Sequence, residues 1–269
     1  MSWRLLEDGE VDIHRNLALE EALAVVNSES QSKMNTLRLW RAMHAVVIGR
    51  FQCVHKEVDI NYCRQTGIAI ARRFTGGGAV FHDMGNLNFT LCMDQKQAYV
   101  GKTLPTLYRN FIGAIAGGLA DIGVPAQFDK ERSCIRIGKK KITGTAGWIK
   151  RGISFIHGTL LINSNLDHLR RSLNAPTDQP QYIRDKRRIR CMESKRDTVT
   201  SITEALSKPP SDREIINAII ESIQAFTRAR IVPGSLTDEE QTTAHALYQS
   251  RYSQSEWNLG RLYPEYNSR

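Results

Sequence analysis

Apolar residues recur over residues 17–27 at the three- and four-residue spacing of a helix that packs on one side. Glu20 and Glu21 interrupt this apolar series, so we expect both carboxylates on the solvent-exposed face of the helix. A second helix is predicted over residues 105–121, where Pro105 falls in the first turn, a position that tolerates proline.

Short segments rich in branched residues predict strands between these helices. The predicted strands cover residues 36–42, 44–50, 68–73, 87–93 and 155–163, and residues 133–147 read as a hairpin. Two short helices are predicted, one over residues 59–65 that ends at Gly67 and one over 166–173.

From Thr198 onward the pattern contains amphipathic helices over 212–228 and 236–252 and no further strand signal. We therefore expect a single α+β domain over residues 1–269, with an α+β body at 1–197 and a helical part at 198–269.

Composition excludes several classes of protein. The 269 residues are 41% hydrophobic and 24% charged, which excludes a disordered or collagen-like chain. No apolar run is long enough for a membrane span, and the acidic N-terminus is unlike a signal peptide, so a cytoplasmic protein with no membrane partner is expected. Five cysteines without a CxxC pair argue against a zinc ribbon or a disulfide framework.

A glycine-rich turn is the most informative segment of the chain. Two arginines, Arg72 and Arg73, end a predicted strand and are followed by Thr75 and the three consecutive glycines Gly76, Gly77 and Gly78. Backbone N–H groups of such a turn can close on a phosphate or carboxylate, and arginines can donate charge-assisted hydrogen bonds to the same anion. The spacing fits neither GxGxxG nor the P-loop motif.

The stretch RRFTGGGAVFHDMGNLNFT resembles the signature of lipoate-protein ligases, which belong to a superfamily with biotin ligases and octanoyl transferases. KKKITGTAG at 139–147 resembles the lysine strand of that family, and HGTLLIN at 157–163 resembles its His-Gly-Thr-Leu-Leu strand. Weaker similarities extend the match over nearly the whole chain in the family's order. The resemblance implies the fold of class II aminoacyl-tRNA synthetases and biotin ligases, a mixed, mainly antiparallel sheet flanked by helices.

The resemblance also implies a reaction. Lipoate ligases join lipoate (or octanoate) to ATP, with Mg²⁺, as an acyl-adenylate, and then transfer the acyl group to a lysine of a carrier domain. Lys141 matches the family's catalytic lysine, a compact charge suited to a phosphate whose charge develops. The matching ATP and lipoyl-AMP positions are Arg72, Arg73, Thr75, Gly76, Gly77, Gly78, Ala79, Val80, Phe81, Asn86, Lys141 and His157.

Alternative interpretations of these residues stay open. Lys141 also fits a position on a solvated hairpin, and His157 also fits a buried position in the core. His82 and Asp83 also fit a structural pair that fixes the glycine turn. The lipoyl tail requires apolar neighbours such as Val47, which core packing explains equally well.

The sequence departs from the family pattern before the lysine strand. Many members carry Gly-Arg-Asn-Asp there, with an aspartate that helps to hold magnesium, whereas this chain has DKERSC at 129–134. Asp129 or Glu131 are the candidate substitutes, so the magnesium ligands are unassigned. Related transferases use a cysteine nucleophile in this region and no ATP, and Cys134 is the candidate for that alternative. A non-catalytic lipoate-binding module is the third alternative.

The resemblance further implies partners. The acyl acceptor would be a lipoyl carrier domain, such as that of a 2-oxoacid dehydrogenase E2 or a glycine cleavage H protein. Full-size bacterial ligases carry a C-terminal accessory domain that does not follow Arg269 here, so a separate accessory subunit is expected. The net charge is +9, and the basic run at 184–197 reads either as a solvated helical face or as a docking surface for an acidic carrier. No nucleic-acid motif accompanies it.

Overall fold

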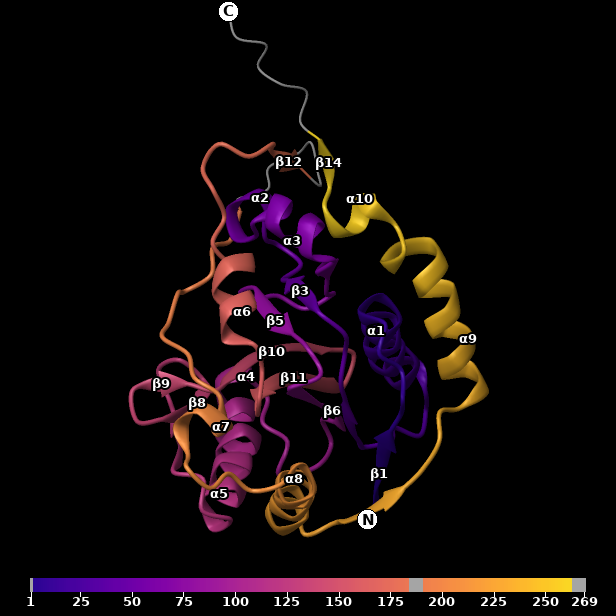
Figure 1. Cartoon of the computed structure of the whole chain (residues 1–269). Coiled ribbons are helices and arrows are strands. Elements are labelled where there is room, and N and C mark those ends of the chain that lie inside the picture. Colours follow the sequence, from indigo (N-terminus) through magenta and orange to yellow (C-terminus); the bar gives the residue numbers. More distant parts are fainter. Residues whose placement is uncertain (1, 184–190, 263–269) are drawn as a thin grey trace, which may run out of the picture.

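A six-stranded sheet forms the centre of the fold, and the computed structural model describes residues 2–183 and 191–262 (Figure 1). In spatial order its strands are β10 (Thr143–Lys150), β11 (Ile153–Leu161), β6 (Asn86–Asp94), β2 (Thr36–Trp40), β1 (Ser2–Glu7) and β13 (Arg230–Pro233). The pairs from β10 to β2 are antiparallel, whereas β1 pairs in parallel with both β2 and β13. The expected mixed, mainly antiparallel sheet is confirmed.

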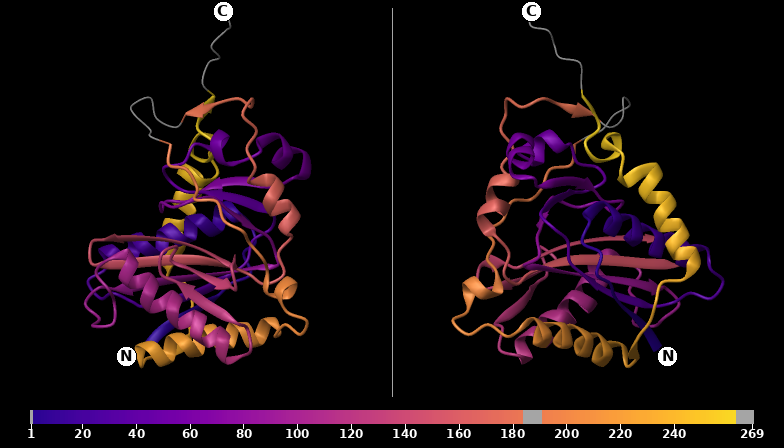
Figure 2. Two further views of the ribbon diagram at one scale, coloured as in Figure 1. Left: turned by 90° about the vertical axis from the view of Figure 1, so that its left-hand side faces the viewer. Right: turned by 45° about the vertical axis from the view of Figure 1, so that its right-hand side comes forward.

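Helices cover both faces of this sheet (Figure 2). On one face α5 (Gly113–Asp121) and α8 (Asp212–Thr227) pack against side chains such as Leu91 and Ile156. On the other face α1 (Ile13–Glu29) packs against their strand neighbours, including Cys92 and Phe155. Because successive strand residues point to opposite faces, both sets of residues are buried, and β6 and β11 are apolar along most of their length.

Smaller elements surround the central layers. Two further three-stranded sheets are β4 (Ala69–Arg72), β3 (Ala45–Ile48) and β5 (Val80–His82), and β7 (Ala126–Asp129), β8 (Cys134–Ile137) and β9 (Lys140–Lys141), while β12 (Tyr182–Ile183) pairs with β14 (Arg261–Leu262). The remaining helices are α2 (Val54–Glu57), α3 (Ile60–Thr66), α4 (Leu104–Leu107), α6 (Leu166–Ser172), α7 (Ile202–Ala205), α9 (Asp238–Leu247) and α10 (Ser255–Asn258), with π-helical segments at Tyr108–Ile112 and Tyr248–Tyr252.

Two predicted elements are realised in modified form. The helix predicted over 105–121 is formed by α4, a π-helical segment and α5 in succession. The hairpin over 133–147 exists only as β8 and β9, because β10 leaves that pair and joins β11 in the central sheet. The chain changes sheets at Ile142, which is fully buried.

The expectation of a C-terminal part without strands is wrong. β13 pairs with β1 and so places the segment after Thr227 at the edge of the central sheet. Neither β13 nor β1 was predicted, since each is short and its pairing partner is remote in sequence. Strand formation here depends on tertiary pairing that local patterns do not carry.

The expectation that Glu20 and Glu21 face solvent is also wrong. Glu20 is fully buried, and Glu21 is nearly so. Glu21 accepts hydrogen bonds from Arg251 and from the Tyr252 hydroxyl, which lie on the C-terminal helices packed against α1. Burial of both carboxylates is tolerated because each is paired and hydrogen-bonded.

The cysteines differ from expectation as well. Cys53 and Cys191 form a disulfide across 138 residues, with Cα atoms 5.3 Å apart, whereas Cys63, Cys92 and Cys134 are free and buried. No local pattern predicts this pair, because only the folded chain brings residues 191–197 against α2. Among the described helices, none is long and apolar enough to cross a membrane.

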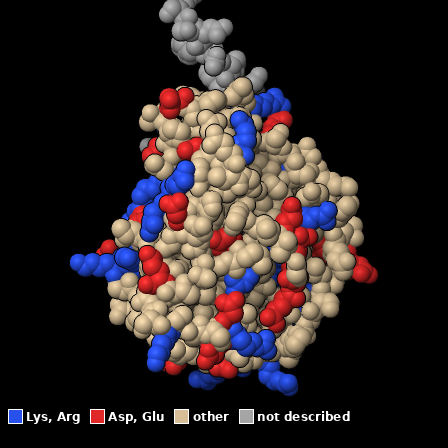
Figure 3. Space-filling view, in the orientation of Figure 1, with Lys and Arg blue, Asp and Glu red and all other residues tan. Residues whose placement is uncertain are grey.

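Acidic and basic side chains are interspersed over the face shown in Figure 3. Arg184, Lys186, Arg187, Arg188 and Arg190 of the basic run lie outside the described residues. Residues 191–197 of the run are described and have no helical conformation, so the expected helical face is wrong for this part.

Candidate active site

The glycine-rich turn forms a loop between β4 and β5 that packs closely on another backbone segment. A Cβ atom on Gly49 would lie 2.1 Å from the carbonyl oxygen of Gly77, so Gly49 must be glycine for the loop to approach. Gly77 itself has a φ of +90°, a conformation that L side chains rarely adopt. Glycine at positions 49 and 77 therefore allows the loop to fold tightly against the neighbouring backbone.

The Arg73 side chain fills the interior of this loop. Its guanidinium donates to the carbonyl oxygens of Gly76 at 2.6 Å and Gly78 at 2.8 Å, and to the Thr75 hydroxyl at 3.1 Å. Burial lowers the pKa of Arg73 to about 10, which leaves it charged at neutral pH. The carbonyl groups of Gly76 and Gly78 are thus directed toward the Arg73 guanidinium.

The Arg72 side chain is directed away from the loop. Its guanidinium is buried and donates to the carbonyl oxygens of Gln52 at 2.6 Å and Trp257 at 2.8 Å. The indole N–H of Trp257 returns a hydrogen bond to the carbonyl oxygen of Arg72. This arrangement ties β4 to α10 and to the chain after Gly49, so the structure places Arg72 among structural contacts.

A buried hydrogen-bond chain connects the loop to α1. Nε2 of His157 lies 2.8 Å from Oγ1 of Thr75, and Nδ1 of the same ring lies 2.6 Å from Oε2 of Glu20. Glu20 also accepts from the Thr90 hydroxyl and lies 3.5 Å from the Arg38 guanidinium. Since imidazole nitrogens take donor and acceptor roles according to tautomer, the carboxylate fixes Nδ1 as a donor.

The residues that follow the loop are held in the core. The His82 ring stacks on Trp40, with centroids 5.7 Å apart, and burial together with the Arg73 charge lowers the pKa of His82 to about 3. Asp83 accepts from the backbone N–H groups of Gly85 and Asn165 rather than pairing with His82. Asn86 is buried and donates to the carbonyl oxygen of Phe81.

Two adjoining cavities lie beside the loop. The first has a volume of about 30 Å³ and is lined mainly by apolar groups, among them Leu17, Trp40 and Val47. The second has a volume of about 700 Å³. Val80, Gly144 and Thr159 line both cavities, so a narrow apolar slot opens beside a large polar chamber.

The large cavity is cationic. Its described lining holds one carboxylate, Asp197, and the five cationic side chains of Lys140, Lys141, Arg170, Lys195 and Arg196. Ala79, Val80 and Phe81 line its inner side. This charge balance favours a polyanionic ligand such as a nucleotide phosphate chain.

Lys141 lies in this lining at the end of β9. Its backbone bonds to Thr198 and Thr200, which fixes the strand end, and burial lowers the pKa of its ammonium. Among the described residues no hydrogen-bond acceptor or ion-pair partner reaches Nζ. Partial burial of an ammonium without a counter-ion costs free energy. An anionic ligand in the cavity would reduce this cost by pairing with the ammonium.

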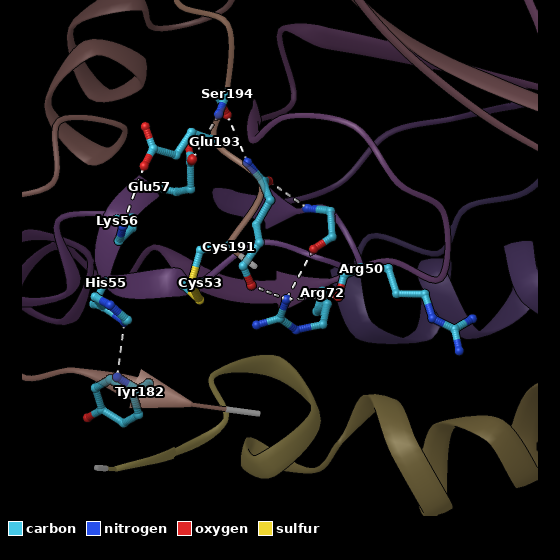
Figure 4. Close-up of a disulfide and its surroundings, with 12 residues drawn as sticks. Arg50, Cys53, His55, Lys56, Glu57, Arg72, Tyr182, Cys191, Glu193 and Ser194 are labelled. Atoms are coloured by element: carbon cyan, nitrogen blue, oxygen red, sulfur yellow. Dashed lines mark hydrogen bonds and ion pairs between the residues drawn. A yellow bond between two sulfur atoms is a disulfide. The ribbon is translucent and has the colours of Figure 1, made fainter. Parts of the chain in front are cut away.

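Residues 194–199 line one wall of the cavity. We call residues 191–197, which lead into this wall and form part of it, the strap. The disulfide joins the start of the strap to Cys53, and the buried carboxylate of Glu57 accepts from the backbone N–H of Ser194 at 2.9 Å (Figure 4). The sequence pattern identified this segment only as part of the basic run at 184–197. Its role as a wall depends on contacts with α2, which local patterns do not reveal.

Cys134 lies in the core at the start of β8. Its side chain is fully buried and lines neither cavity beside the loop. Burial raises the pKa of the thiol, which the nearby Lys141 charge only partly offsets. A nucleophilic cysteine needs the opposite combination, namely access and a stabilised thiolate.

The nearby carboxylates do not fit a magnesium site. Asp129 accepts from Nε of Arg136 at 2.6 Å, and Asp197 accepts from Nη2 of the same arginine at 2.6 Å. Glu131 is exposed on the turn after β7. Within residues 2–183 and 191–262, no group of three or more metal-binding side chains is present.

Known proteins resemble this chain over nearly its whole length. The sequence model of the family described as "Lipoyl protein ligase A/B catalytic domain" matches residues 12–224. Lipoate-protein ligase A subunit 1 of Thermoplasma acidophilum is 31% identical over 258 residues, covering 93% of each chain. Octanoyltransferase LipM of Symbiobacterium thermophilum is 28% identical over 281 residues, covering 96% of this chain and 98% of that protein.

Solved structures agree with these sequence matches. A lipoate protein ligase of T. acidophilum with bound lipoic acid superposes with a TM-score of 0.81 at 28% identity, covering 97% of this chain and 100% of that one. A lipoate-protein ligase A bound with ATP gives a TM-score of 0.80 at 29% identity with the same coverage. A bipartite T. acidophilum ligase studied with its E2 lipoyl domain gives 0.80 at 30% identity and 99% coverage of each chain.

Proposed function

The chain belongs to the lipoyl protein ligase A/B catalytic family, and we propose that within it the chain is an ATP-dependent lipoate ligase. The protein would activate lipoate or octanoate as the acyl-adenylate and then acylate a lysine of a carrier domain. The observation that carries this proposal is the ammonium of Lys141, which has no partner among residues 2–183 and 191–262 and lies in a cationic chamber that adjoins an apolar slot.

The two cavities match the two ends of an acyl-adenylate. The apolar slot, lined by Leu17, Trp40 and Val47 among others, suits an acyl chain. The cationic chamber suits the phosphates of ATP. Val80 and Thr159 line both, so the carboxylate of the acid and the α-phosphate would meet beside Gly144.

Activation joins a carboxylate oxygen of the acid to the α-phosphorus of ATP and breaks the bond from that phosphorus to the β-phosphate oxygen. Lys141 would stabilise the charge that develops on the α-phosphate oxygens, and pyrophosphate would leave. In the second step the amine of the carrier lysine attacks the acyl carbon, loses a proton and forms an amide. The leaving group is AMP.

The glycine loop would hold the nucleotide through its backbone. Arg73 keeps the carbonyl groups of Gly76 and Gly78 turned inward, and His157 holds the hydroxyl of Thr75. We therefore assign Arg73, Thr75 and His157 the task of fixing the loop, with Ala79, Val80 and Phe81 on the ligand side. Metal ions would arrive with ATP, and we assign them no protein ligands.

The transferase alternative rests on relatives such as the LipM octanoyltransferase. That chemistry needs a reachable thiolate, whereas the Cys134 thiol is buried and burial raises its pKa. The burial of Cys134 therefore favours the ligase. The position of Lys141 in a cationic chamber also argues against a module that only binds lipoate, since lipoate has no phosphate for that chamber to bind.

We propose a lipoyl carrier domain as the acyl acceptor, because a solved relative is bipartite and was studied with its E2 lipoyl domain. A separate accessory subunit is proposed on the same ground. The basic side chains around the cavity mouth, Lys195 and Arg196 among them, would speed the encounter with an acidic carrier.

Acylation of a purified lipoyl carrier domain tests the ligase proposal directly. The carrier is incubated with the protein and lipoate, with and without ATP, and its mass is measured. We expect acylation only with ATP, and the Cys134→Ser variant should retain it. Acylation from a thioester donor without ATP, lost in Cys134→Ser, would instead establish the transferase.

A further inference from the structure

The guanidinium of Arg38, on β2, is fully buried and faces two carboxylates. Nε and Nη2 donate to the two carboxylate oxygens of Asp8 at 2.7 and 2.9 Å, and Nη2 also donates to Oδ1 of Asn16. Nη1 is directed toward Glu20, with 3.5 Å between Nη1 and Oε1. The planar fork of the guanidinium therefore joins a partly exposed carboxylate to a carboxylate in the core.

Two side chains that line the apolar slot rest on this cluster. The guanidinium carbon of Arg38 lies 5.1 Å from the centroid of the Trp40 ring. Oε2 of Glu20 lies 2.6 Å from Nδ1 of His157. The Thr90 hydroxyl donates to Oε1 of Glu20 and accepts from Nε1 of Trp40 at 3.3 Å. Trp40 and His157 line the slot, whereas Arg38 does not, so Arg38 can act on the slot only through its neighbours.

The charge of Arg38 compensates that of Glu20. The Glu20 side chain has no exposed surface, and burial of an ionised carboxylate is costly unless a cation or hydrogen bonds offset the lost hydration. Without Arg38 the carboxylate would lose this compensation. Its contacts with His157 and Thr90 would then no longer be held in one geometry, and the slot wall would lose its fixed shape.

A second buried arginine in the same sheet lacks this connection. Arg4, on β1, donates to both carboxylate oxygens of Glu240 at 2.6 and 2.8 Å, and it also donates to the Thr36 hydroxyl. None of these three residues lines the apolar slot or the cationic cavity. A buried pair of arginine and carboxylate supports the fold at Arg4, whereas at Arg38 the pair also supports the wall of the slot.

We propose that Arg38 is a positioning residue for the acyl substrate, because its guanidinium holds Trp40 directly and His157 through Glu20 in the orientation that the slot requires. This inference rests on the proposed function, in which the slot holds the acyl chain, and it assigns Arg38 no contact with substrate. Arg38 should therefore affect the acid more than the nucleotide. The glycine loop keeps its separate support from Arg73 when Arg38 is replaced.

Equilibrium binding tests this assignment without requiring turnover. Affinities for lipoate and for ATP are measured separately by calorimetry on the wild type and on Arg38→Met, Arg38→Lys and Arg4→Met. We expect Arg38→Met to weaken lipoate binding about tenfold and ATP binding less than about threefold, as for loss of coupling between neighbouring residues. The KM for lipoate in pyrophosphate exchange should rise in parallel, whereas the KM for ATP should stay nearly constant.

Arg38→Lys keeps the charge but loses the fork, so its lipoate affinity should lie between those of Arg38→Met and the wild type. Arg4→Met is the matched control, because it removes a buried, paired arginine that has no connection to the slot. Its lipoate affinity should equal that of the wild type, even if urea unfolding shows a loss of stability as large as that of Arg38→Met.

Equal weakening of lipoate and ATP binding in Arg38→Met, or equal weakening of lipoate binding in Arg4→Met, would show that Arg38 only supports the fold and would overturn the inference. Unchanged lipoate affinity in Arg38→Met would overturn it too, while the ligase proposal would stand. If Arg38→Met does not fold, lipoate affinity in Arg38→Lys equal to that of the wild type is the overturning result. A wild-type protein that binds neither lipoate nor ATP would overturn the proposed function itself.

Discussion

Oε2 of Glu20 lies 2.6 Å from Nδ1 of His157, deep beneath the glycine loop. Nε2 of the same imidazole lies within hydrogen-bond distance of Thr75. The His157 ring therefore connects helix α1 to the glycine loop. The loop is thus fixed from below by this chain and from within by Arg73. The first support comes from Glu20 and His157, which lie far from the loop in sequence, and the second comes from Arg73, which directly precedes it.

Replacement of Glu20 should measure the strength of this support. Glu20→Gln removes the charge that faces His157 and Arg38 but keeps the side-chain volume, so we expect the free energy of unfolding to fall by about 1–3 kcal/mol. Urea denaturation gives this value. Glu29→Gln on the same helix is the control, because Glu29 pairs with Arg151 in solvent and its loss should cost less than about 1 kcal/mol. Equal losses in the two variants would contradict the account.

Lys141→Ala should abolish acylation of the carrier, with a fall of at least about 100-fold in kcat/KM for loss of one preorganised charge. Burial lowers the pKa of Lys141, so its charged form opposes folding, and we expect the Tm of the variant to be no lower than that of the wild type. Lys139→Ala, on the exposed turn before β9 and outside the cavity lining, should leave activity within a few-fold. A large loss of folded protein in Lys141→Ala would contradict the catalytic assignment.

Acid should destabilise the protein through His82. Burial lowers the pKa of His82 from 6.5 to about 3. Between these two pH values His82 is protonated in the unfolded chain and neutral in the folded chain. Above pH 6.5 both states are neutral and His82 contributes nothing, and stability falls as pH drops toward 3. Between pH 7 and pH 4.5 this residue should account for a loss of about 2–3 kcal/mol.

The control for that experiment is His82→Gln, which has no titrating ring. Urea unfolding at the two pH values should show a smaller pH-dependent loss in the variant than in the wild type. The same loss in both proteins would mean that other groups, such as His14, whose pKa is also lowered by burial, govern the acid response.

Reduction of the disulfide should weaken nucleotide binding and stability together. A dithiol reductant would convert Cys53 and Cys191 to thiols and release the start of the strap. For a loop of this length we expect the free energy of unfolding to fall by about 2–5 kcal/mol. The KM for ATP should rise, whereas the KM for lipoate should stay nearly constant, because the apolar slot does not include the strap.

Cys53→Ser is the matched comparison for the reductant. The variant should resemble the reduced wild type and should show no further response to dithiol. A reductant effect of the same size in Cys53→Ser would assign it to another group.

The fold was largely accessible from the sequence. Amphipathic spacing located α1 and α8, and branched runs located the strands β2, β3, β4, β6 and β11. Asp59 and Gly67 marked both ends of α3, because an N-cap acceptor and a left-handed glycine are local requirements. The resemblance then supplied the family, which the comparisons confirm.

Features that depend on remote partners were not accessible. Glu20 reads as a surface residue until His157 and Arg38 are brought beside it. β13 has only four residues and becomes a strand because β1 offers it an edge. Ser194 and Glu57 are ordinary residues in the sequence, and their contact arises only when the strap folds over α2.

The most direct measurement of the central claim is lipoate-dependent exchange of labelled pyrophosphate into ATP. This exchange requires reversible formation of an acyl-adenylate and needs no carrier. The account predicts exchange that depends on lipoate and is lost in Lys141→Ala but retained in Cys134→Ser. Absence of exchange from a protein that transfers an acyl group from a thioester through Cys134 would contradict it.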